Sequence, residues 1–414
     1  MRAQVKKLLL QVREVWLILS ITLLFLLLFE VALSLGYAML DRARAGSGAA
    51  DWRARADVYA GVAWARDYYR EFEESSATRW ASYVYWRRQP YQGRYINVDA
   101  DGLRRTWTCA EGRAPAGGGR RIFVFGGSTL WGVGARDDFT IPSLLAAELA
   151  EAGTECEVTN YGESGYVSSQ EVIALIQELR AGNIPDLVIF YDGVNDTYSA
   201  YQQQVAGLPQ NETNRIREFN LSHARGSPAL RTLCLHRMVD SLSLTRLARG
   251  VLRRVGIMPP AGDAATYWGD TNNDVAGKEA LFRNVLAVYR ANVRLVEALG
   301  KQYGFQSLFY WQPTVFDKSH RTAYEEVQRK SVEGLEPFYG EVNARLREGK
   351  FEAEHDGAFH DLTGIFSDAS RPVYIDWCHV SEWGNGLVAE RMAADVAGLL
   401  AAGKTLANPV LAPP

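Results

Sequence analysis

The chain has 414 residues, of which 47% are hydrophobic and 22% are charged, and its formal net charge is −3. These globular values provide ample material for a core, in two ordinary domains or in one elaborated domain. The slightly negative charge argues against a nucleic-acid-binding protein, so we expect no nucleic-acid partner. The cysteines have no metal-type spacing; they are Cys109, Cys156, Cys234 and Cys378.

The first predicted element is an apolar segment at the N-terminus, from Val15 to Leu40, interrupted by Glu30. At about 1.5 Å per residue it is long enough to cross a bilayer. Basic residues precede it, and a basic flank stays in the cytoplasm. These residues are Arg2, Lys6, Lys7 and Arg13. We therefore expect residues 1–14 to be cytoplasmic, residues 15–40 to cross the inner (cytoplasmic) membrane once, and the rest to lie on the periplasmic or extracytoplasmic side.

A cleaved signal peptide is the competing interpretation of this segment. The apolar stretch is long for a signal peptide, and no clean small-x-small cleavage site follows it directly, which favours an uncleaved anchor. Glu30 is expected to lie near the outer interface or to face a partner helix. Its alternative is a tolerated, neutralised carboxyl group.

Residues 41–118 are predicted to be a tether followed by an N-terminal extension. Arg42 to Ala50 is small and basic, which suits a tether. A helical, charged pattern covers Trp52 to Ser75, and Ser82 to Trp86 is predicted to be a strand. Arg94 to Arg104 is predicted to be a further strand that ends in an Asp-Gly turn.

From residue 119 to about residue 402 the chain alternates between predicted strands and helices, and residues 403–414 form a tail. The expected strands are Ile122–Phe125, Glu155–Tyr161, Leu187–Tyr191 and Ser307–Trp311. The expected helices are Phe139–Leu149, Ser168–Arg180, Leu281–Tyr303 and Trp383–Leu400. Such alternation predicts an α/β domain whose parallel sheet is covered by helices on both faces.

Residues 197–275 show no such alternation and are treated as an insertion. The segment contains polar runs and an amphipathic, basic piece from Leu230 to Arg254. A long insertion on the C-terminal side of a strand suits a lid. A passive excursion or an oligomer contact explains the segment equally well.

Glycine-bearing turns follow three of the predicted strands, and each contains residues suited to chemistry. They are Gly126-Gly-Ser128 after the first strand, Gly162 after the second and Gly193-Val-Asn195 after the third. In an α/β sheet, the carboxyl ends of the strands are where ligands bind. An Asp376-Trp-Cys-His379 run follows near the C-terminus. We expect the strand-end loops to bring these residues to one edge of the sheet.

Acyl transfer needs a nucleophile, a base, an orienting group for the base and donors for an oxyanion. Ser128 can be the nucleophile and His379 the base, with Asp376 close enough to hydrogen-bond the imidazole. Asn195 offers a side-chain NH₂ group to an oxyanion, and Gly162 and Ser128 offer backbone N–H groups. The alternative for Ser128 is a structural Gly-rich turn in which the serine only caps a helix.

Other sites are less well supported. Cys378 is a rival nucleophile, or a disulfide partner in an oxidising compartment, but Ser128 is better placed at a strand end. His355, His360 and Asp361 lack strong ligand spacing, so no metal site is expected. No Gly-Lys-Ser/Thr follows the glycine-rich turn, which argues against a phosphate-binding loop.

Taken in order, Gly-Gly-Ser128-Thr, Gly162, Gly193-x-Asn195-Asp196 and Asp376-x-x-His379 resemble the motifs of the SGNH (GDSL-type) hydrolase family. The resemblance covers about Arg120 to Leu400. It implies a three-layer, flavodoxin-like SGNH hydrolase fold with a central parallel sheet over residues 119–402, and no cofactor. Carried over, it implies a triad of Ser128, Asp376 and His379 with Gly162 and Asn195 as oxyanion donors.

Gly127 departs from the family pattern, which usually has Asp at this position. The Gly-Gly-Ser-Thr form resembles that of many membrane-anchored bacterial members, so we do not interpret Gly127 as a sign of inactivation. Asn97 to Arg104 also resembles a segment found upstream of the catalytic block in anchored relatives.

These features predict a serine-dependent acyl-ester hydrolase displayed outside the cytoplasmic membrane on one helix. Its expected substrate is an acylated carbohydrate of the cell surface or another ester. One alternative is an O-acyltransferase, such as an O-acetyltransferase, that modifies a polysaccharide with the same triad. Another alternative is a catalytically silent glycan-binding protein, against which the complete triad argues.

Overall fold

The computed structural model describes residues 2–46, 51–107, 119–223, 228–258, 277–349, 351–355 and 357–401. The chain forms two compact units. The smaller unit comprises residues 1–49 and 214–267, and the larger unit comprises residues 50–213 and 268–414. The predicted tail at 403–414 and Cys109 lie outside the described residues.

A five-stranded parallel sheet forms the centre of the larger unit. Its strands are β5 (Arg120–Gly126), β6 (Cys156–Asn160), β7 (Leu187–Asp192), β8 (Gln306–Trp311) and β9 (Phe359–Asp361). The spatial order β6-β5-β7-β8-β9 corresponds to the 2-1-3-4-5 order of flavodoxin-like folds. Because the strand order reverses between β5 and β7, the carboxyl ends of these strands are where this architecture places a ligand.

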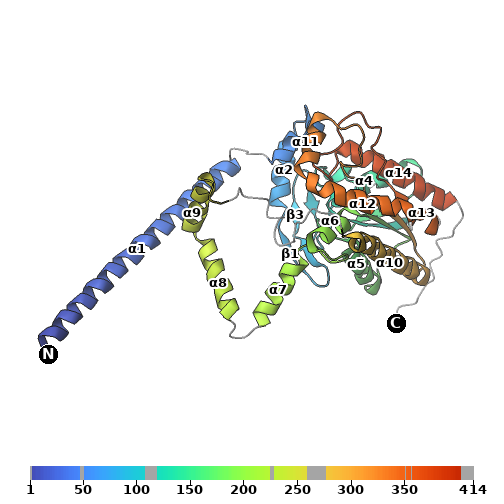
Figure 1. The fold of residues 1–414 in the computed structure, drawn as a ribbon. Coiled ribbons are helices and arrows are strands. Elements are labelled where there is room, and N and C mark those ends of the chain that lie inside the picture. Colours follow the sequence, from blue (N-terminus) through green and yellow to red (C-terminus); the bar gives the residue numbers. More distant parts are fainter. Residues whose placement is uncertain are drawn as a thin grey trace. The chain divides into compact units, whose positions relative to one another are not determined.

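Helices cover both faces of the sheet. They are α4 (Ile141–Glu151), α5 (Ser168–Arg180), α6 (Val194–Gln203), α10 (Glu279–Tyr303), α12 (Glu336–Glu348) and α14 (Glu382–Ala401). Phe123 and Phe125 of β5 pack in the core shared with α5, α10 and α12, whereas Ile122 and Val124 pack in the core shared with α4 and α14. Figure 1 shows α4 and α14 on one side of the sheet and α5 and α10 on the other. The predicted three-layer α/β fold is confirmed.

The strands and helices predicted from periodicity in this unit are confirmed with small shifts at their ends. β9 was not predicted, because three residues are too short to show a pattern. The segment between β8 and α14 also holds α11 (Ala323–Ser331), α12 and α13 (Phe351–Glu354), none of which was predicted. These helices are mostly polar, so their apolar periodicity is weak.

The N-terminal extension belongs to the larger unit. Its elements are α2 (Ala65–Glu74), the hairpin of β1 (Thr78–Ala81) and β2 (Tyr85–Arg88), and the short pair β3 (Tyr91–Gln92) and β4 (Asn97–Val98). The prediction of a strand over Ser82–Trp86 is confirmed only for Tyr85 and Trp86, which belong to β2, because the chain turns at Ser82–Val84. Tyr83 and Tyr85 have φ angles of 71° and 75°. Bulky residues rarely adopt such positive angles, so the sequence did not predict them. Trp52–Ser75 forms two 3₁₀ turns before α2 instead of one helix.

Helices make up the described part of the smaller unit, apart from Leu242 and residues 255–258. It contains α1 (Arg2–Gly46), most of α7 (Glu212–His223), α8 (Pro228–Ser241) and α9 (Ser243–Arg254). In α1, Gln11–Leu40 is long and apolar enough to span a membrane. The helix continues through residues 42–46, where a tether was expected. The insertion is thus more regular than its sequence pattern indicated, and α9 packs against α1.

Candidate active site

Ser128 lies immediately beyond β5, at the first position of the short helix α3 (Ser128–Trp131). Only Gly127 separates it from the end of the strand. A Cβ atom on Gly126 would lie 2.8 Å from the carbonyl oxygen of Tyr191 on β7, so this turn has no space for a side chain. The backbone N–H of Ser128 belongs to the first turn of α3, where helix N–H groups have no partner within the helix.

His379 connects Ser128 to Asp376. Its Nε2 lies 2.7 Å from the Ser128 hydroxyl, and its Nδ1 lies 2.6 Å from Oδ2 of Asp376. An ionised carboxylate only accepts hydrogen bonds, so Nδ1 carries the hydrogen and Nε2 of the neutral ring is left to accept the Ser128 proton. The structure therefore brings together the three residues that the sequence predicted.

Asp376 also organises its own loop. Its second oxygen, Oδ1, accepts hydrogen bonds from the backbone N–H groups of Cys378 and His379, at 3.0 and 2.8 Å. Burial would raise the pKa of Asp376, but the positive charge that His379 can carry and these hydrogen bonds prevail and lower it to about 2. This carboxyl group therefore stays ionised at neutral pH and holds the imidazole in one orientation.

Asn195 reaches the same edge of the sheet from the turn after β7. Gly193 has a φ of 106°, which redirects the chain into α6. The Asn195 amide nitrogen donates to the carbonyl of Tyr166 at 2.7 Å, which leaves its second hydrogen for another acceptor. A Cβ atom on Gly127 would lie only 2.2 Å from this nitrogen. A side chain at position 127, such as the Asp of the SGNH pattern, would therefore displace the Asn195 amide from this position, whereas glycine leaves space for it.

The backbone N–H of Gly162 differs from the prediction in one respect. It already donates to the side-chain oxygen of Asn160 at 2.9 Å. A Cβ atom on Gly162 would lie 2.6 Å from the backbone nitrogen of Trp131, so glycine is needed here for close packing against α3. An oxyanion would have to share this N–H with Asn160, and its role as a donor stays a prediction.

Cys378 is a poor rival to Ser128. Its side chain is buried, and burial, followed by the neighbouring Asp376 carboxylate, raises the pKa of the thiol well above its usual range. Its sulfur lies 3.7 Å from Nδ1 of His379, the nitrogen already bonded to Asp376. Cys378 is a free thiol in the structure, as are Cys156 and Cys234.

Arg104, a residue of the N-terminal extension, supports the Ser128 loop and was not predicted to do so. Its fully buried guanidinium donates to the carbonyls of Trp131, Gly132 and Ala135 at 3.1, 2.6 and 2.6 Å. Asp137 pairs with its Nε at 2.9 Å. The resemblance identified the segment that ends at Arg104 but not its contacts, because its partners lie about 30 residues further along the chain.

Other side chains of the extension support the same loop. The Tyr68 hydroxyl donates to the carbonyl of Gly132 at 2.9 Å and accepts from the N–H of Gly134 at 2.8 Å. The ring of Trp131 is contacted by the guanidinium groups of Arg88 and Arg104, each 4.3 Å from the ring centroid. The loop that follows Ser128 is therefore held largely by residues 68–104.

Three buried carboxyl groups lie close to one another in the region of the Asn195 turn. They are Glu171, Asp192 and Asp196. Burial raises the pKa of each, and their mutual repulsion adds to the effect for Glu171. Asp196 accepts a hydrogen bond of 2.5 Å from the Ser168 hydroxyl. Burial behind this turn therefore disfavours the charged form of these carboxyl groups.

Two of the histidines outside this loop, His355 and His360, have other partners. His355 pairs with Glu297 at 2.9 Å, and the ring of His360 stacks on Tyr310. Within the described ranges, the side chains grouped closely enough to share a metal ion are Asp376, Cys378 and His379. The hydrogen bonds of His379 already account for that grouping.

Comparisons with known proteins give only a distant likeness. No family model matches the chain, and no curated protein matches it. Among solved structures, an acetyl xylan esterase is 14% identical, with a TM-score of 0.33 over 67% of this chain and 99% of its own. A variant of an acetyl xylan esterase from Geobacillus stearothermophilus is 14% identical, with a TM-score of 0.34 over 68% and 95%.

A member of the lipolytic G-D-S-L family from Veillonella parvula is 13% identical, with a TM-score of 0.33 over 68% of this chain and 98% of its own. The chain is thus similar, at this distance, to esterases and lipolytic proteins of the GDSL type. Because the identities and TM-scores are low, function is argued below from the geometry of the site.

Proposed function

We propose that this protein is a serine-dependent acyl-ester hydrolase of the SGNH (GDSL) type. The observation that carries the proposal is the chain of short hydrogen bonds from Ser128 through His379 to Asp376. The carboxyl ends of β5 and β7, where Ser128 and Asn195 lie, are the ligand position of this strand order. A merely helix-capping serine would not need an imidazole that is itself oriented by a carboxylate.

In the proposed reaction, the Ser128 oxygen attacks the acyl carbonyl while Nε2 of His379 takes the hydroxyl proton. The Asn195 amide and the Ser128 backbone N–H donate to the oxyanion that forms, with Gly162 as a further donor. The tetrahedral intermediate collapses, the ester C–O bond breaks, and His379 returns the proton to the leaving alcohol. Water then attacks the acyl-enzyme by the same route and releases the acid.

The ionised Asp376 stabilises the imidazolium that forms at each step and keeps Nε2 directed at the reacting oxygen. The substrate class we propose is an acylated carbohydrate of the cell surface, on the basis of the family resemblance and the expected location. Transfer of the acyl group to a sugar hydroxyl instead of water uses the same residues, and is the alternative that the assay must separate.

The catalytic part is proposed to lie outside the cytoplasmic membrane, anchored by α1. The basic N-terminal flank and the apolar length of Gln11–Leu40 support this orientation. A C-terminal alkaline phosphatase fusion is expected to be active, and a C-terminal fusion to a fluorescent protein that folds only in the cytoplasm is expected to be dark. The reverse pattern would reject the orientation.

The direct test of the function is covalent labelling of the full-length protein in detergent with a fluorophosphonate, together with turnover of short-chain aryl esters. Wild type is expected to be labelled at Ser128 and to release the acid, whereas Ser128→Ala and His379→Ala are expected to do neither. Ser76→Ala, which removes an exposed serine hydroxyl, is the matched control and should behave as wild type.

Full labelling or near-normal turnover of Ser128→Ala would reject the proposal. Adding sugar acceptors distinguishes the two reactions, because acyl groups that appear on the sugar indicate a transferase. Tight glycan binding by a protein that neither turns over esters nor reacts with the probe would indicate the silent alternative.

A further inference from the structure

Glu30 is the one acidic residue of the apolar segment 15–40 in α1, and the smaller unit shows what its side chain binds. The Glu30 carboxylate accepts hydrogen bonds from the backbone N–H groups of Ser243 and Leu244, at 2.5 and 2.9 Å. These are the first two residues of α9. A carboxylate at this position satisfies N–H groups that have no partner in the helix and interacts favourably with the helix dipole.

Two further contacts join the same parts of α1 and α9. The hydroxyls of Ser34 and Ser243 are 2.8 Å apart. The guanidinium of Arg246 lies over the ring of Tyr37 at 4.2 Å. Glu30, Ser34 and Tyr37 follow one another along α1, so the contact runs toward the end of the apolar segment from which the chain continues to the larger unit.

The position of Glu30 along α1 sets the depth of this contact. About 20 residues of helix cross the hydrocarbon core of a bilayer. Counted from Val15, which follows the charged pair Arg13 and Glu14, they end near Ser34. Glu30 then lies about 6 Å inside the boundary at about 1.5 Å per residue. The N-terminus of α9 is therefore placed at the boundary between headgroups and acyl chains.

α9 has the composition of a helix that lies on a membrane surface. Leu244, Leu247, Val251 and Val255 recur at helical spacing on one side, although Val255 comes just after the last turn. The opposite side is basic, with Arg246, Arg249 and Arg253, and Arg254 lies between the two faces. No acidic residue occurs in Ser243–Arg254. An apolar face opposite arginines is the pattern of interfacial amphipathic helices.

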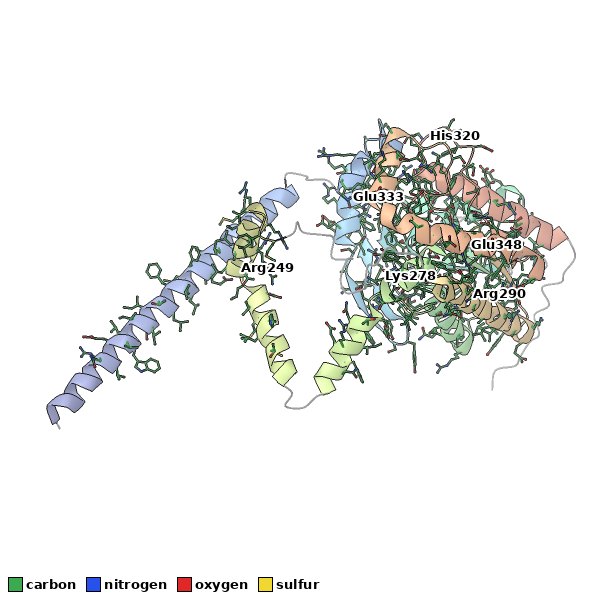
Figure 2. The ribbon with its side chains drawn as sticks, in the orientation of Figure 1. Arg249, Lys278, Arg290, His320, Glu333 and Glu348 are labelled. Atoms are coloured by element: carbon green, nitrogen blue, oxygen red, sulfur yellow. The ribbon has the colours of Figure 1, made fainter. Side chains whose placement is uncertain are left out.

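The apolar face of α9 is left open to its surroundings in its C-terminal half. Val251 and Val255 are 53% and 61% exposed, and Ile257 just beyond is 71% exposed. Arg253 and Arg254 are also exposed, while Arg249, labelled in Figure 2, pairs with Asp240 of α8. The exposed valines suit contact with acyl chains, and the exposed arginines suit contact with anionic headgroups.

We propose that α9 is a second membrane contact, an interfacial helix that binds anionic phospholipid. Glu30 fixes its N-terminus to α1, its apolar face enters the acyl boundary, and Arg253 and Arg254 bind phosphate-bearing headgroups. The inference rests on the proposal that α1 spans a membrane, but it does not depend on the ester chemistry of the Ser128 site. The occupant is a lipid surface and not a protein partner, because the contact continues directly from the apolar surface of α1.

Photo-cross-linking of the full-length protein in nanodiscs tests the proposal. A benzophenone amino acid in place of Val255 is expected to form phospholipid adducts. The same replacement of Val327 in α11, which is equally exposed at 61%, is the matched control and should form about a tenth as many or fewer. Adducts to protein instead of lipid at position 255, or lipid adducts no more frequent than at 327, would overturn the proposal.

The lipid class is tested in nanodiscs that mix phosphatidylglycerol with phosphatidylcholine. Adducts at position 255 are expected to be enriched in phosphatidylglycerol, and Arg253→Gln should reduce the enrichment about fivefold, as should Arg254→Gln. Equal yields from both lipids would reject recognition of anionic headgroups. Carbonate extraction of the same samples checks the anchor, so a failure of α1 to hold the membrane is distinguished from a failure of α9.

Glu30→Ala tests the attachment of α9 to α1. The replacement makes the apolar segment more apolar, so membrane insertion should be retained while lipid adducts at position 255 fall at least severalfold. Glu30→Gln retains an acceptor oxygen and is expected to have a smaller effect. An unchanged adduct yield with Glu30→Ala would show that Glu30 does not place α9.

Discussion

The loop of Ser128 and the loop of His379 meet in the hydrogen bond between these two side chains, and Thr129 also donates to the carbonyl of Cys378, yet the two loops are held in different ways. In the His379 loop, Asp376 binds both the imidazole and two backbone N–H groups within the same four residues. The carbonyls of this loop are bound from elsewhere, by Gln312, Tyr324 and the N–H of Val315. The Ser128 loop depends on a distant segment, since Arg104 and Tyr68 bind the carbonyls that follow α3. The base is thus oriented locally, and the nucleophile is positioned by the extension.

This difference indicates that the extension supports the loop of the proposed nucleophile. Residues 51–107 contribute side chains to a core that includes Trp131 and Val133 next to the nucleophile turn, and Ile375 next to the base. A segment that only linked an anchor to a domain would not place a fully buried arginine among four residues of the nucleophile loop. The variants below test how far each loop depends on its support.

The largest effect is expected where the two loops meet. Ser128→Ala and His379→Ala should each lower kcat about a millionfold, and the double variant should be no worse than either alone, because the residues act as a unit. The measurement is kcat on an aryl ester with active-site titration. Losses that multiply in the double variant would show that the loops work independently.

Asp376→Asn is expected to lower kcat about ten-thousandfold, because the amide can bind the imidazole in the wrong tautomer. One oxygen remains to accept from the loop N–H groups, so the circular dichroism spectrum should be unchanged. The measurement is kcat of Asp376→Asn and of wild type at saturating substrate. A loss below about tenfold would mean that the loop positions His379 without the carboxylate.

A hundredfold loss of kcat is expected when the turn after β7, which carries Asn195, is altered. Asn195→Ala should lower kcat about a hundredfold and change KM little, because the lost donor acts on the transition state. Gly127→Ala should produce a similar loss, since its Cβ atom would displace the Asn195 amide. Normal kcat in Gly127→Ala, with normal folding, would mean that Asn195 does not act from this position.

The base loop should also be the more acid-sensitive of the two. The folded-state pKa of Asp376 is about 2, below its ordinary value of 3.8, so its charge stabilises the fold above about pH 4 and this contribution is lost as the pH falls toward 2. The expected contribution is about 2 kcal/mol at neutral pH. Denaturant unfolding of wild type and Asp376→Asn measures it, and a difference that does not shrink below pH 4 would contradict it.

The smallest effect is expected from the support of the nucleophile loop. Arg104→Lys keeps the charge next to Asp137 but loses the fork that binds several carbonyls at once. We expect kcat to fall about tenfold with KM nearly unchanged, as for a slightly misplaced nucleophile. Arg105→Lys, at the exposed neighbouring position, is the control. A change in thermal stability alone would show that Arg104 is structural only.

The sequence was most informative where a local pattern has one physical meaning. The short apolar run from Ile122 to Phe125 predicted a buried strand, and β5 buries both of its faces. The glycine-bearing turns predicted that Ser128 and Asn195 would lie at one edge of the sheet, together with His379, because parallel strands end at the same edge. No local pattern reports contacts across the fold. The pairing of Arg104 with the carbonyls after α3 was therefore missed. The hydrogen bond from the Gly162 N–H to Asn160 is local, two residues back, and was also not predicted.

Aromatic residues misled the prediction in the extension. Ser82 to Trp86 has the composition of a strand, yet its first three residues form a turn, and Tyr83 and Tyr85 take up left-handed backbone angles. In the insertion, α8 and α9 were not resolved as separate helices, since the polar break at Ser241–Ser243 is short. Glu30 was expected to face a partner helix or the interface, and it binds the start of α9.

The hydrogen bond between Ser128 and His379 joins residues 251 positions apart. At a synthesis rate of about 5–20 residues per second, roughly 10–50 s pass between the appearance of the serine and that of its histidine. If Ser128 is the nucleophile, a nascent chain therefore holds an unactivated hydroxyl for well over half of its synthesis, until His379 has been added and the fold has closed.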